Sequence, residues 1–300
     1  MPPDALGRRA DRRWAQLAAE RPALTGAIDL QRRTVGRQIQ LLAELAALPD
    51  QPPRVDEATV LHHLADGLPV LRADIGPLPV DHLVPAMEGV CRDLEAVTGF
   101  TAATRVREAL AARRVDPARL LALAYQRDES GVRQLAGERA LAVDVLWLVA
   151  DVVVGPVLHL QQRAILREHE PDSPVRDAVA RWDQGYCPAC GSWPALAEAF
   201  AGERLLRCGA CAAGWPLTSH RCTYCGARDD GSFRMIAPDR AVPGRTLELC
   251  RQCGGYLKGL EAAAPTPFPL LSIEDVGSAE LDRAARHHGF RRPPPAALPR

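Results

Sequence analysis

Eight of the nine cysteines in this 300-residue sequence fall between residues 186 and 256, in four pairs with the spacing C-x-x-C. Two thiolates at this spacing can bind one metal ion at about 2.3 Å if the backbone between them turns back tightly. Three of the pairs are followed at once by glycine, which adopts such turn conformations at little cost. The pairs are Cys187/Cys190, Cys208/Cys211, Cys222/Cys225 and Cys250/Cys253. Taken four cysteines at a time, they predict two tetrahedral metal sites.

The N-terminal residues indicate the compartment in which these thiols work. Residues 1–14 are charged and lack the apolar run of a signal peptide. Arg8-Arg9 and Arg12-Arg13 are twin arginines without that run, so they do not form an export signal. We therefore expect a cytoplasmic protein, in which thiols stay reduced and eight cysteines favour metal over disulfides.

The spacing along the chain indicates which pairs share an ion. Seventeen residues separate Cys190 from Cys208, and they contain two strand-like runs around the turn signal Ala201-Gly202-Glu203. Twenty-four residues separate Cys225 from Cys250, again with two strand-like runs, 232–237 and 246–249. Each hairpin would bring consecutive pairs together. Site one is therefore assigned to Cys187, Cys190, Cys208 and Cys211, and site two to Cys222, Cys225, Cys250 and Cys253. A cross-braced grouping, first pair with third and second with fourth, is the alternative.

Metal would have a structural role in both hairpin modules. Neither module carries enough large apolar side chains to fold alone. Structural zinc in small fingers supplies about 10–16 kcal/mol of apparent folding free energy. Arg207, Arg221 and Arg251 adjoin ligands, and we expect them to offset the negative charge of four thiolates around a divalent ion. Zinc and iron both accept tetrahedral sulfur, so the spacing does not name the metal.

The chain before the cysteines is predicted to be all-α. Apolar residues recur at helical spacing, no strand alternation occurs before residue 180, and Asp116-Pro117 suits a helix start. Asp81 is likewise expected to cap a helix that runs to about Val97. The predicted helices, six or seven in all, include residues 8–20, 24–48, 56–65, 81–97, 102–113 and 117–126. A further short helix would lead to Trp182.

Residues 141–160 are the most apolar stretch of the chain. Their twelve Leu and Val residues would favour membrane insertion by about 4–7 kcal/mol. Asp144 and Asp151 oppose insertion by a similar amount, and Gly155, Pro156 and His159 add to that cost. A buried helix of a soluble bundle is therefore expected. The two aspartates lie two turns apart, and we expect them to face solvent or an arginine rather than to form a catalytic pair.

Charge and motif content narrow the classes of function. The formal net charge is zero, so no overall attraction to nucleic acid or anionic membrane is predicted. Residues 181–260 hold ten basic and seven acidic side chains without the interleaved aromatics of a stacking surface. A nucleic-acid-binding zinc ribbon is one alternative, and a thiol or iron redox protein is another. No nucleophile–base pair, phosphate loop or dinucleotide motif is present, so we expect no enzyme.

The four cysteine pairs and their neighbours resemble the formate dehydrogenase accessory protein family, FdhE. The resemblance covers about residues 186–290 and includes, downstream of the cysteines, Ile273-Glu-Asp275 and Leu281-Asp-Arg-Ala-Ala285 as a closing helix. One departure is Ala212, where a glycine would follow the second pair. The matching segments are Cys187-Pro-Ala-Cys-Gly-Ser192, Cys208-Gly-Ala-Cys211, Arg221-Cys222-Thr-Tyr-Cys225 and Glu248-Leu-Cys250-Arg-Gln-Cys-Gly-Gly-Tyr-Leu-Lys258.

The resemblance implies a helical domain followed by two rubredoxin-like modules. It also implies iron as the metal, with zinc as the alternative, at two ions per chain. The implied role is that of a non-catalytic accessory protein that binds the catalytic subunit of formate dehydrogenase in the cytoplasm and is required for the active enzyme. We expect neither nucleic-acid binding nor membrane insertion, and a homodimer is left open.

These inferences divide the chain into four segments. Residues 1–180 form an all-α domain, 181–216 the first metal module, 217–262 the second, and 263–300 a C-terminal helix with a disordered tail. Cys91 lies on a predicted helix among apolar neighbours and is expected to be a small buried side chain. Trp193, Trp215 and Tyr256 follow knuckles and are expected to cover the metal–sulfur core.

Overall fold

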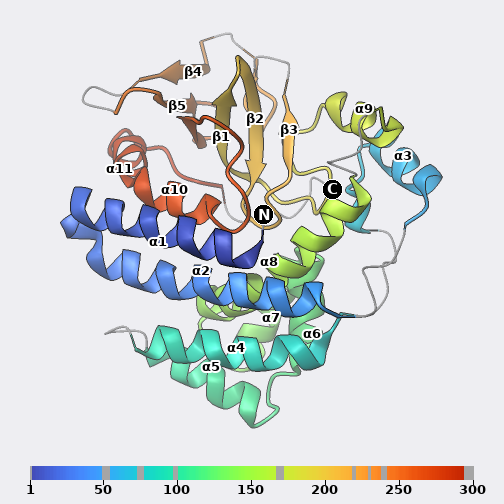
Figure 1. The fold of residues 1–300 in the computed structure, drawn as a ribbon, viewed down its shortest axis with the longest axis vertical. Helices are drawn as coiled ribbons and strands as arrows, with labels where there is room; N and C mark the ends of the chain where they lie inside the picture. Colours follow the sequence, from blue (N-terminus) through green and yellow to red (C-terminus); the bar gives the residue numbers. More distant parts are fainter. Residues whose placement is uncertain are drawn as a thin grey trace. The chain divides into compact units, whose positions relative to one another are not determined.

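The computed structural model describes residues 2–48, 55–72, 78–96, 101–166, 172–217, 221–228, 231–237 and 242–293 (Figure 1). The chain forms two compact units that interleave in sequence. The helical unit comprises Met1–Pro53 and Asp74–Gln161, and the sheet unit comprises Arg54–Ala73 and Gln162–Arg300. The segment 54–73 therefore groups with the cysteine-rich part of the chain, unlike in the predicted division at residue 180.

The helical unit contains seven of the α-helices in the described residues, the last of which continues into the sheet unit. Helix α2 packs against α1 and α4, and α4 packs against α5 and α6. The apolar spacing that predicts α2 is the spacing of its buried side chains, which include Ile28, Val35 and Leu45. The helices are α1 (Pro3–Glu20), α2 (Thr25–Ala46), α4 (Val80–Glu95), α5 (Thr101–Ala111), α6 (Pro117–Tyr125), α7 (Glu129–Glu138) and α8 (Val143–Ile165).

Two details of the helix starts test the sequence prediction. Helix α6 begins at Pro117, and Asp116 accepts a hydrogen bond from the Ala118 backbone N–H at 3.0 Å, as predicted. The predicted cap at Asp81 is wrong, because α4 already begins at Val80 and Asp81 lies in its first turn. In the first turn, the Asp81 carboxylate still interacts favourably with the positive end of the helix dipole.

The helix α7 is absent from the prediction. It starts at Glu129, after the N-cap residue Asp128, whose side chain accepts a hydrogen bond from the Gly131 N–H at 2.9 Å. The helix contains two glycines, which weaken a helical pattern. With it, the described residues before 172 hold eight α-helices rather than six or seven, including α3 (Glu57–Ala65) of the sheet unit.

Helix α8 is long and apolar enough to cross a membrane by length and composition, and more than half of its most apolar window is buried within the protein. The core helix of a soluble protein has the same composition. Asp144 is exposed, and Asp151 forms an ion pair with Arg127. The two aspartates thus face solvent and an arginine, as expected.

The sheet unit contains one six-stranded mixed sheet, in the order β3-β2-β1-β6-β5-β4 (Figure 1). Each predicted metal module contributes three consecutive strands in the same relative order, and the modules join where β1 pairs with β6 in parallel. The two predicted modules are therefore parts of a single sheet. The strands are β1 (Pro194–Phe200), β2 (Glu203–Cys208), β3 (Gly214–Pro216), β4 (Phe233–Ile236), β5 (Arg245–Cys250) and β6 (Tyr256–Glu261).

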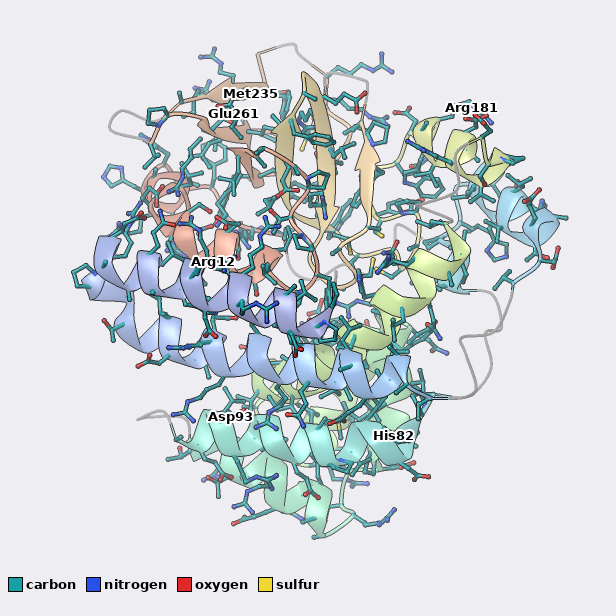
Figure 2. All side chains as sticks on the ribbon, viewed as in Figure 1. Arg12, His82, Asp93, Arg181, Met235 and Glu261 are labelled. Carbon is teal, nitrogen blue, oxygen red and sulfur yellow. The ribbon has the colours of Figure 1, made fainter. Side chains whose placement is uncertain are left out.

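Both predicted hairpins are present. In the first, Ala201 and Gly202 have φ of 50° and 82° between the paired residues Phe200 and Glu203, as in a two-residue type I′ turn. In the second, β4 pairs with β5 in antiparallel register. Strand β4 ends the sheet, and its Met235 side chain is 51% exposed (Figure 2).

The predicted closing helix is two short helices, α10 (Leu271–Gly277) and α11 (Ala279–His287), of which α11 packs against β5 and β6. The chain then returns to the sheet, where Arg291 forms a bridge with Gly255. Arg291 is thus paired with the sheet, and the next residue, Arg292, forms ion pairs with Asp275 and Asp282. Residues 294–300 lie outside the described part.

A buried cation ties these helices to the sheet. Lys258 on β6 is the only lysine of the chain, is 0% exposed, and lies 2.6 Å from an Asp275 carboxylate oxygen and 3.0 Å from one of Asp282. Arg292 pairs with both carboxylates. Burial opposes ionisation of Asp275, but Arg292 and Lys258 lower its pKa below the usual value. A carboxylate whose pKa is lowered by folding stabilises the folded state at pH values above its unfolded-state pKa. That stability is lost as the pH falls through the lower, folded-state pKa.

We expect Lys258→Met to destabilise the sheet unit by about 3 kcal/mol, because it leaves two partly exposed carboxylates with Arg292 as their remaining cation. Thermal unfolding at neutral pH measures this loss. Arg32→Met is the matched control, since Arg32 pairs with Asp11 at 2.8 Å while both side chains are more than half exposed. Equal effects of the two substitutions would contradict the structural role of Lys258.

Candidate metal centres

The four C-x-x-C turns have the same backbone hydrogen bonds. In each turn the first cysteine donates its N–H to the carbonyl five residues later, and the residue four positions on donates back to the carbonyl of that cysteine. The hydrogen bonds donated by the first cysteine run from Cys187 to Ser192, Cys208 to Ala213, Cys222 to Ala227 and Cys250 to Gly255, at 2.9, 2.9, 2.7 and 2.9 Å. We call each such turn a knuckle, numbered one to four along the chain.

One residue of each knuckle has a left-handed backbone. It is the residue that follows the second cysteine, and its φ is 80° at Gly191, 60° at Ala212, 73° at Gly226 and 68° at Gly254. Knuckle two therefore has the same shape as the others although it carries alanine. An L-residue in this region costs about 1–2 kcal/mol, which the rest of knuckle two must offset.

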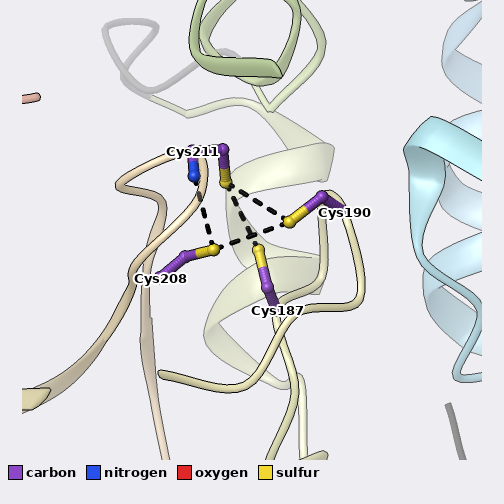
Figure 3. Close-up of side chains that lie close together, drawn as sticks. All are labelled: Cys187, Cys190, Cys208 and Cys211. Carbon is purple, nitrogen blue, oxygen red and sulfur yellow. Dashed lines mark hydrogen bonds between the residues drawn. The ribbon is translucent and has the colours of Figure 1, made fainter. Parts of the chain in front are cut away.

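Site one brings together the sulfur atoms of Cys187, Cys190, Cys208 and Cys211 (Figure 3). The Sγ atoms of Cys190 and Cys208 are 3.5 Å apart, those of Cys187 and Cys211 3.6 Å, and those of Cys190 and Cys211 3.8 Å. All four cysteines are buried. Knuckle one precedes β1 and knuckle two follows β2, so the first hairpin closes the site.

Site two brings together Cys222, Cys225, Cys250 and Cys253 at the end of the second hairpin. Its Sγ atoms are 3.7 Å apart between Cys222 and Cys253 and 3.6 Å apart between Cys225 and Cys250. Here Cys225 is exposed and Cys253 is partly exposed. Consecutive pairs therefore meet at both sites, and the cross-braced grouping is not the one in the structure.

The sulfur spacing fits a tetrahedral ion. Four sulfurs at about 2.3 Å from a central metal lie about 3.8 Å from one another, whereas a disulfide requires about 2.05 Å. The shortest sulfur–sulfur distances are 3.5 to 3.8 Å, and all four sulfurs of each site lie within 4.8 Å of one another. Both quartets thus have the separation of ligands that share one ion and are too far apart for disulfides.

Burial makes several of these thiols weaker acids. It raises the pKa of Cys187 and Cys211 well above the usual value, and raises that of Cys253 to about 11. A bound divalent ion requires thiolates, so binding would displace protons and would weaken as the pH falls.

The arginines next to the ligands have carboxylate partners. Arg207 pairs at 2.8 Å with Glu198, and both side chains are almost fully buried. Arg207 also donates to the carbonyls of Ala212 and Thr266, and so holds knuckle two against the loop after β6. Arg221 pairs with Asp183 at 2.8 Å. The charges of Arg207 and Arg221 are thus balanced locally, and the expectation that they offset thiolate charge is not supported by these contacts.

Aromatic rings connect the two sites. Tyr186 and Trp193 flank knuckle one, and Tyr224 lies inside knuckle three. Ring centroids are 6.1 Å apart between Tyr186 and Trp193 and 5.4 Å between Trp193 and Tyr224, in edge-to-face geometry. Beside them, a Cβ on Gly185 would clash with the Thr223 backbone. The entry to knuckle one therefore packs directly on knuckle three.

The other sequence-predicted residues are placed as follows. Trp215 is fully buried and donates its indole N–H to the Gln184 carbonyl, whereas Tyr256 donates to Asp282 and belongs to the Lys258 cluster. Cys91 is fully buried on α4, and burial raises its pKa to about 12, as expected of an inert thiol.

Sequence analysis missed one contributor to site one. The backbone N–H groups of Val70 and Leu71 donate at 2.9 Å to the carbonyls of Pro188 and Ala189, the two residues between the cysteines of knuckle one. The only sign of this contact in the sequence is that Val70 and Leu71 form an apolar pair within a segment rich in glycine and proline.

We expect opposite effects from exchanging glycine and alanine at the left-handed knuckle positions. Gly226→Ala should destabilise the zinc-loaded protein by about 1 kcal/mol, since an added Cβ has open space and only backbone strain remains. Ala212→Gly should raise stability by up to about 1 kcal/mol. Thermal unfolding of the zinc-loaded protein measures both. Gly137→Ala in helix α7 is the control and should stabilise, because that glycine also has open space but a helical backbone.

We expect a chelator to remove the two ions at different rates. Site two should lose its ion first, because Cys225 is exposed and all four ligands of site one are buried. Metal content per chain, followed over time in excess chelator, should fall in two phases. Cys222→Ser/Cys225→Ser should remove the fast phase, and Cys187→Ser/Cys190→Ser the slow one. Release of both ions in a single phase from the unaltered chain would contradict this order.

Comparison with solved structures gives a match described as the crystal structure of the FdhE protein from Pseudomonas aeruginosa. The match has a TM-score of 0.57 at 20% sequence identity and covers 96% of this chain and 93% of that chain. No family model and no curated protein match the chain. The predicted fold class, a helical N-terminal region followed by β modules with two four-cysteine clusters, is confirmed. This chain therefore has the fold of the P. aeruginosa FdhE protein.

Proposed function

We propose that this chain is a member of the formate dehydrogenase accessory protein family, FdhE. In this proposal it is a non-catalytic cytoplasmic protein that binds the catalytic subunit of formate dehydrogenase and is required for formation of the active enzyme. The observation that carries the proposal is the presence of both cysteine quartets within a fold shared with an FdhE protein over nearly the whole chain. The matching residues around the knuckles add to it.

The chain's own residues would perform this role by forming a rigid surface. The eight knuckle cysteines would hold two ions, iron in the proposal and zinc as the alternative. Each ion would supply a tetrahedral crosslink between the two ends of a hairpin. Arg207 and Glu198 then tie knuckle two to the Thr266 backbone, and Lys258 ties β6 to α10 and α11. These contacts fix the loops around the metal centres for a partner to recognise.

The proposal excludes membrane insertion and nucleic-acid binding from the role, and it leaves a homodimer open. Helix α8 is assigned to a protein core because most of its apolar side chains are buried. The ion pair of Asp151 with Arg127 fits this assignment, since an unpaired aspartate is costly in lipid.

A redox role is the second candidate, and exposure of Cys225 favours it. An iron–thiolate centre with an exposed ligand could exchange one electron with a reductant in solution. Reversible bleaching of the iron-loaded protein by a mild reductant, lost in Cys222→Ser/Cys225→Ser, would support this candidate.

We expect the metal-loaded chain to retain a formate dehydrogenase catalytic subunit from the same organism in a pull-down. Arg32→Met, which changes an exposed ion pair, should retain it equally well. A variant that combines Cys187→Ser/Cys190→Ser with Cys222→Ser/Cys225→Ser loses both metal sites. It should no longer retain the catalytic subunit, because the surface around the centres would lose its shape. In a strain that lacks the chain, formate dehydrogenase activity should fall and should return with the unaltered gene. Normal activity in that strain would overturn the proposed role.

A further inference from the structure

A segment from the N-terminal half of the chain is attached to site one. Residues 57–72, which we call the strap, contain α3, the connection Asp66–Pro69 and the short 3-10 helix Val70–Arg72. In sequence the strap lies between α2 and α4 of the helical unit, yet it groups with the sheet unit. Specific contacts must therefore hold the strap beside the cysteines.

The strap binds the metal-binding turn itself. The N–H groups of Val70 and Leu71 donate to the carbonyls of Pro188 and Ala189, both at 2.9 Å. Those carbonyls belong to the x-x residues of the first C-x-x-C pair. Their directions depend on the tight turn of knuckle one, and an ion shared by Cys187 and Cys190 would lock that turn. Two consecutive hydrogen bonds of the strap thus depend on the geometry of the metal centre.

Further contacts surround these two hydrogen bonds. The Tyr186 hydroxyl, next to Cys187, donates to the Gly67 carbonyl at 2.8 Å. Gly67 has a φ of 70°, and a Cβ there would lie 3.5 Å from the Gln184 amide nitrogen, so the turn passes close to the entry of knuckle one. Val70 and Leu71 are 1% and 4% exposed. Val70 and Leu71 are therefore buried beside residues that position the ligands of site one.

The two ends of the strap are held differently. Helix α3 packs on α9 (Pro174–Ala180) and buries Val60 and Leu64, so it has an attachment of its own outside the cysteine turns. The 3-10 helix, in contrast, is attached through the backbone of knuckle one. Loss of the ion should therefore free residues 67–72 before it frees α3.

We propose that the strap is a metal-dependent conformational device, in which the ion of site one fixes knuckle one and thereby holds residues 67–72 in place. When site one loses its ion, the strap's end is released, and Val70, Leu71 and the carbonyls of Pro188 and Ala189 become accessible. The metal state of a buried centre is thus transmitted to a segment that adjoins the helical unit in sequence. The proposal depends on metal binding at site one and not on the formate dehydrogenase role.

Hydrogen exchange on the full-length chain, loaded with zinc or depleted by chelation, tests the device. We expect the amides of Val70 and Leu71 to exchange about tenfold faster or more after depletion. Without the ion, knuckle one no longer holds its two carbonyl acceptors in place, so these hydrogen bonds open more often. Cys187→Ser/Cys190→Ser in zinc should reproduce the depleted rates, and Cys222→Ser/Cys225→Ser in zinc should not. In the site-one variant, where site two keeps its ion, amides of β5 and β6 such as Leu247 and Leu257 should keep their protection.

Trypsin gives an independent readout, because Arg72 is the single basic residue of the strap that the enzyme can recognise. Cleavage after Arg72 should accelerate on depletion and in the site-one variant only. Three results would overturn the proposal: unchanged exchange at Val70 and Leu71 after depletion, an equal effect from loss of site two, or loss of protection across the whole sheet unit in the site-one variant. A pull-down failure with intact metal-dependent exchange would instead overturn the formate dehydrogenase role alone.

Discussion

The gathering of four sulfurs at the end of a short hairpin is the constraint on which the sheet unit depends. A quartet with sulfur atoms 3.5 to 3.8 Å apart provides no disulfide crosslink and little hydrogen bonding of its own. A cation at its centre converts the same arrangement into a crosslink between distant turns. The knuckles, with their repeated backbone hydrogen bonds, make the sulfur positions a consequence of local chain geometry.

The remaining architecture builds on two copies of this arrangement. Each module consists of a knuckle, two strands, a second knuckle and a third strand, and the copies join through the parallel pairing of β1 with β6. Ala197 lies opposite Gly259 in that pairing. Buried ion pairs then connect the sheet to the chain after β6: Arg207 and Glu198 contact the Thr266 backbone, and Lys258 pairs with Asp275 and Asp282. The metal centres and the ion pairs thus hold different parts of one sheet.

The parts of this fold that sequence predicts are those governed by local chemistry. Cysteine spacing and the Ala201-Gly202 turn signal predict which pairs meet and where the first hairpin turns. Apolar periodicity predicts most of the helices. The parallel β1–β6 pairing and the attachment of Val70 and Leu71 to knuckle one are contacts between residues roughly sixty to one hundred and twenty positions apart, and a single sequence carries no local signal for them. Helix α7 was missed because its two glycines interrupt the pattern.

Lys258 has a consequence that concerns the chemistry of the whole chain. It is the only lysine among 37 basic residues, and it is 0% exposed. The folded protein therefore presents no ε-amino group to solvent. Acylating enzymes, isopeptide-forming tags and amine-coupling reagents would find their lysine target only after the sheet unit has opened, so modification of this single side chain would record unfolding.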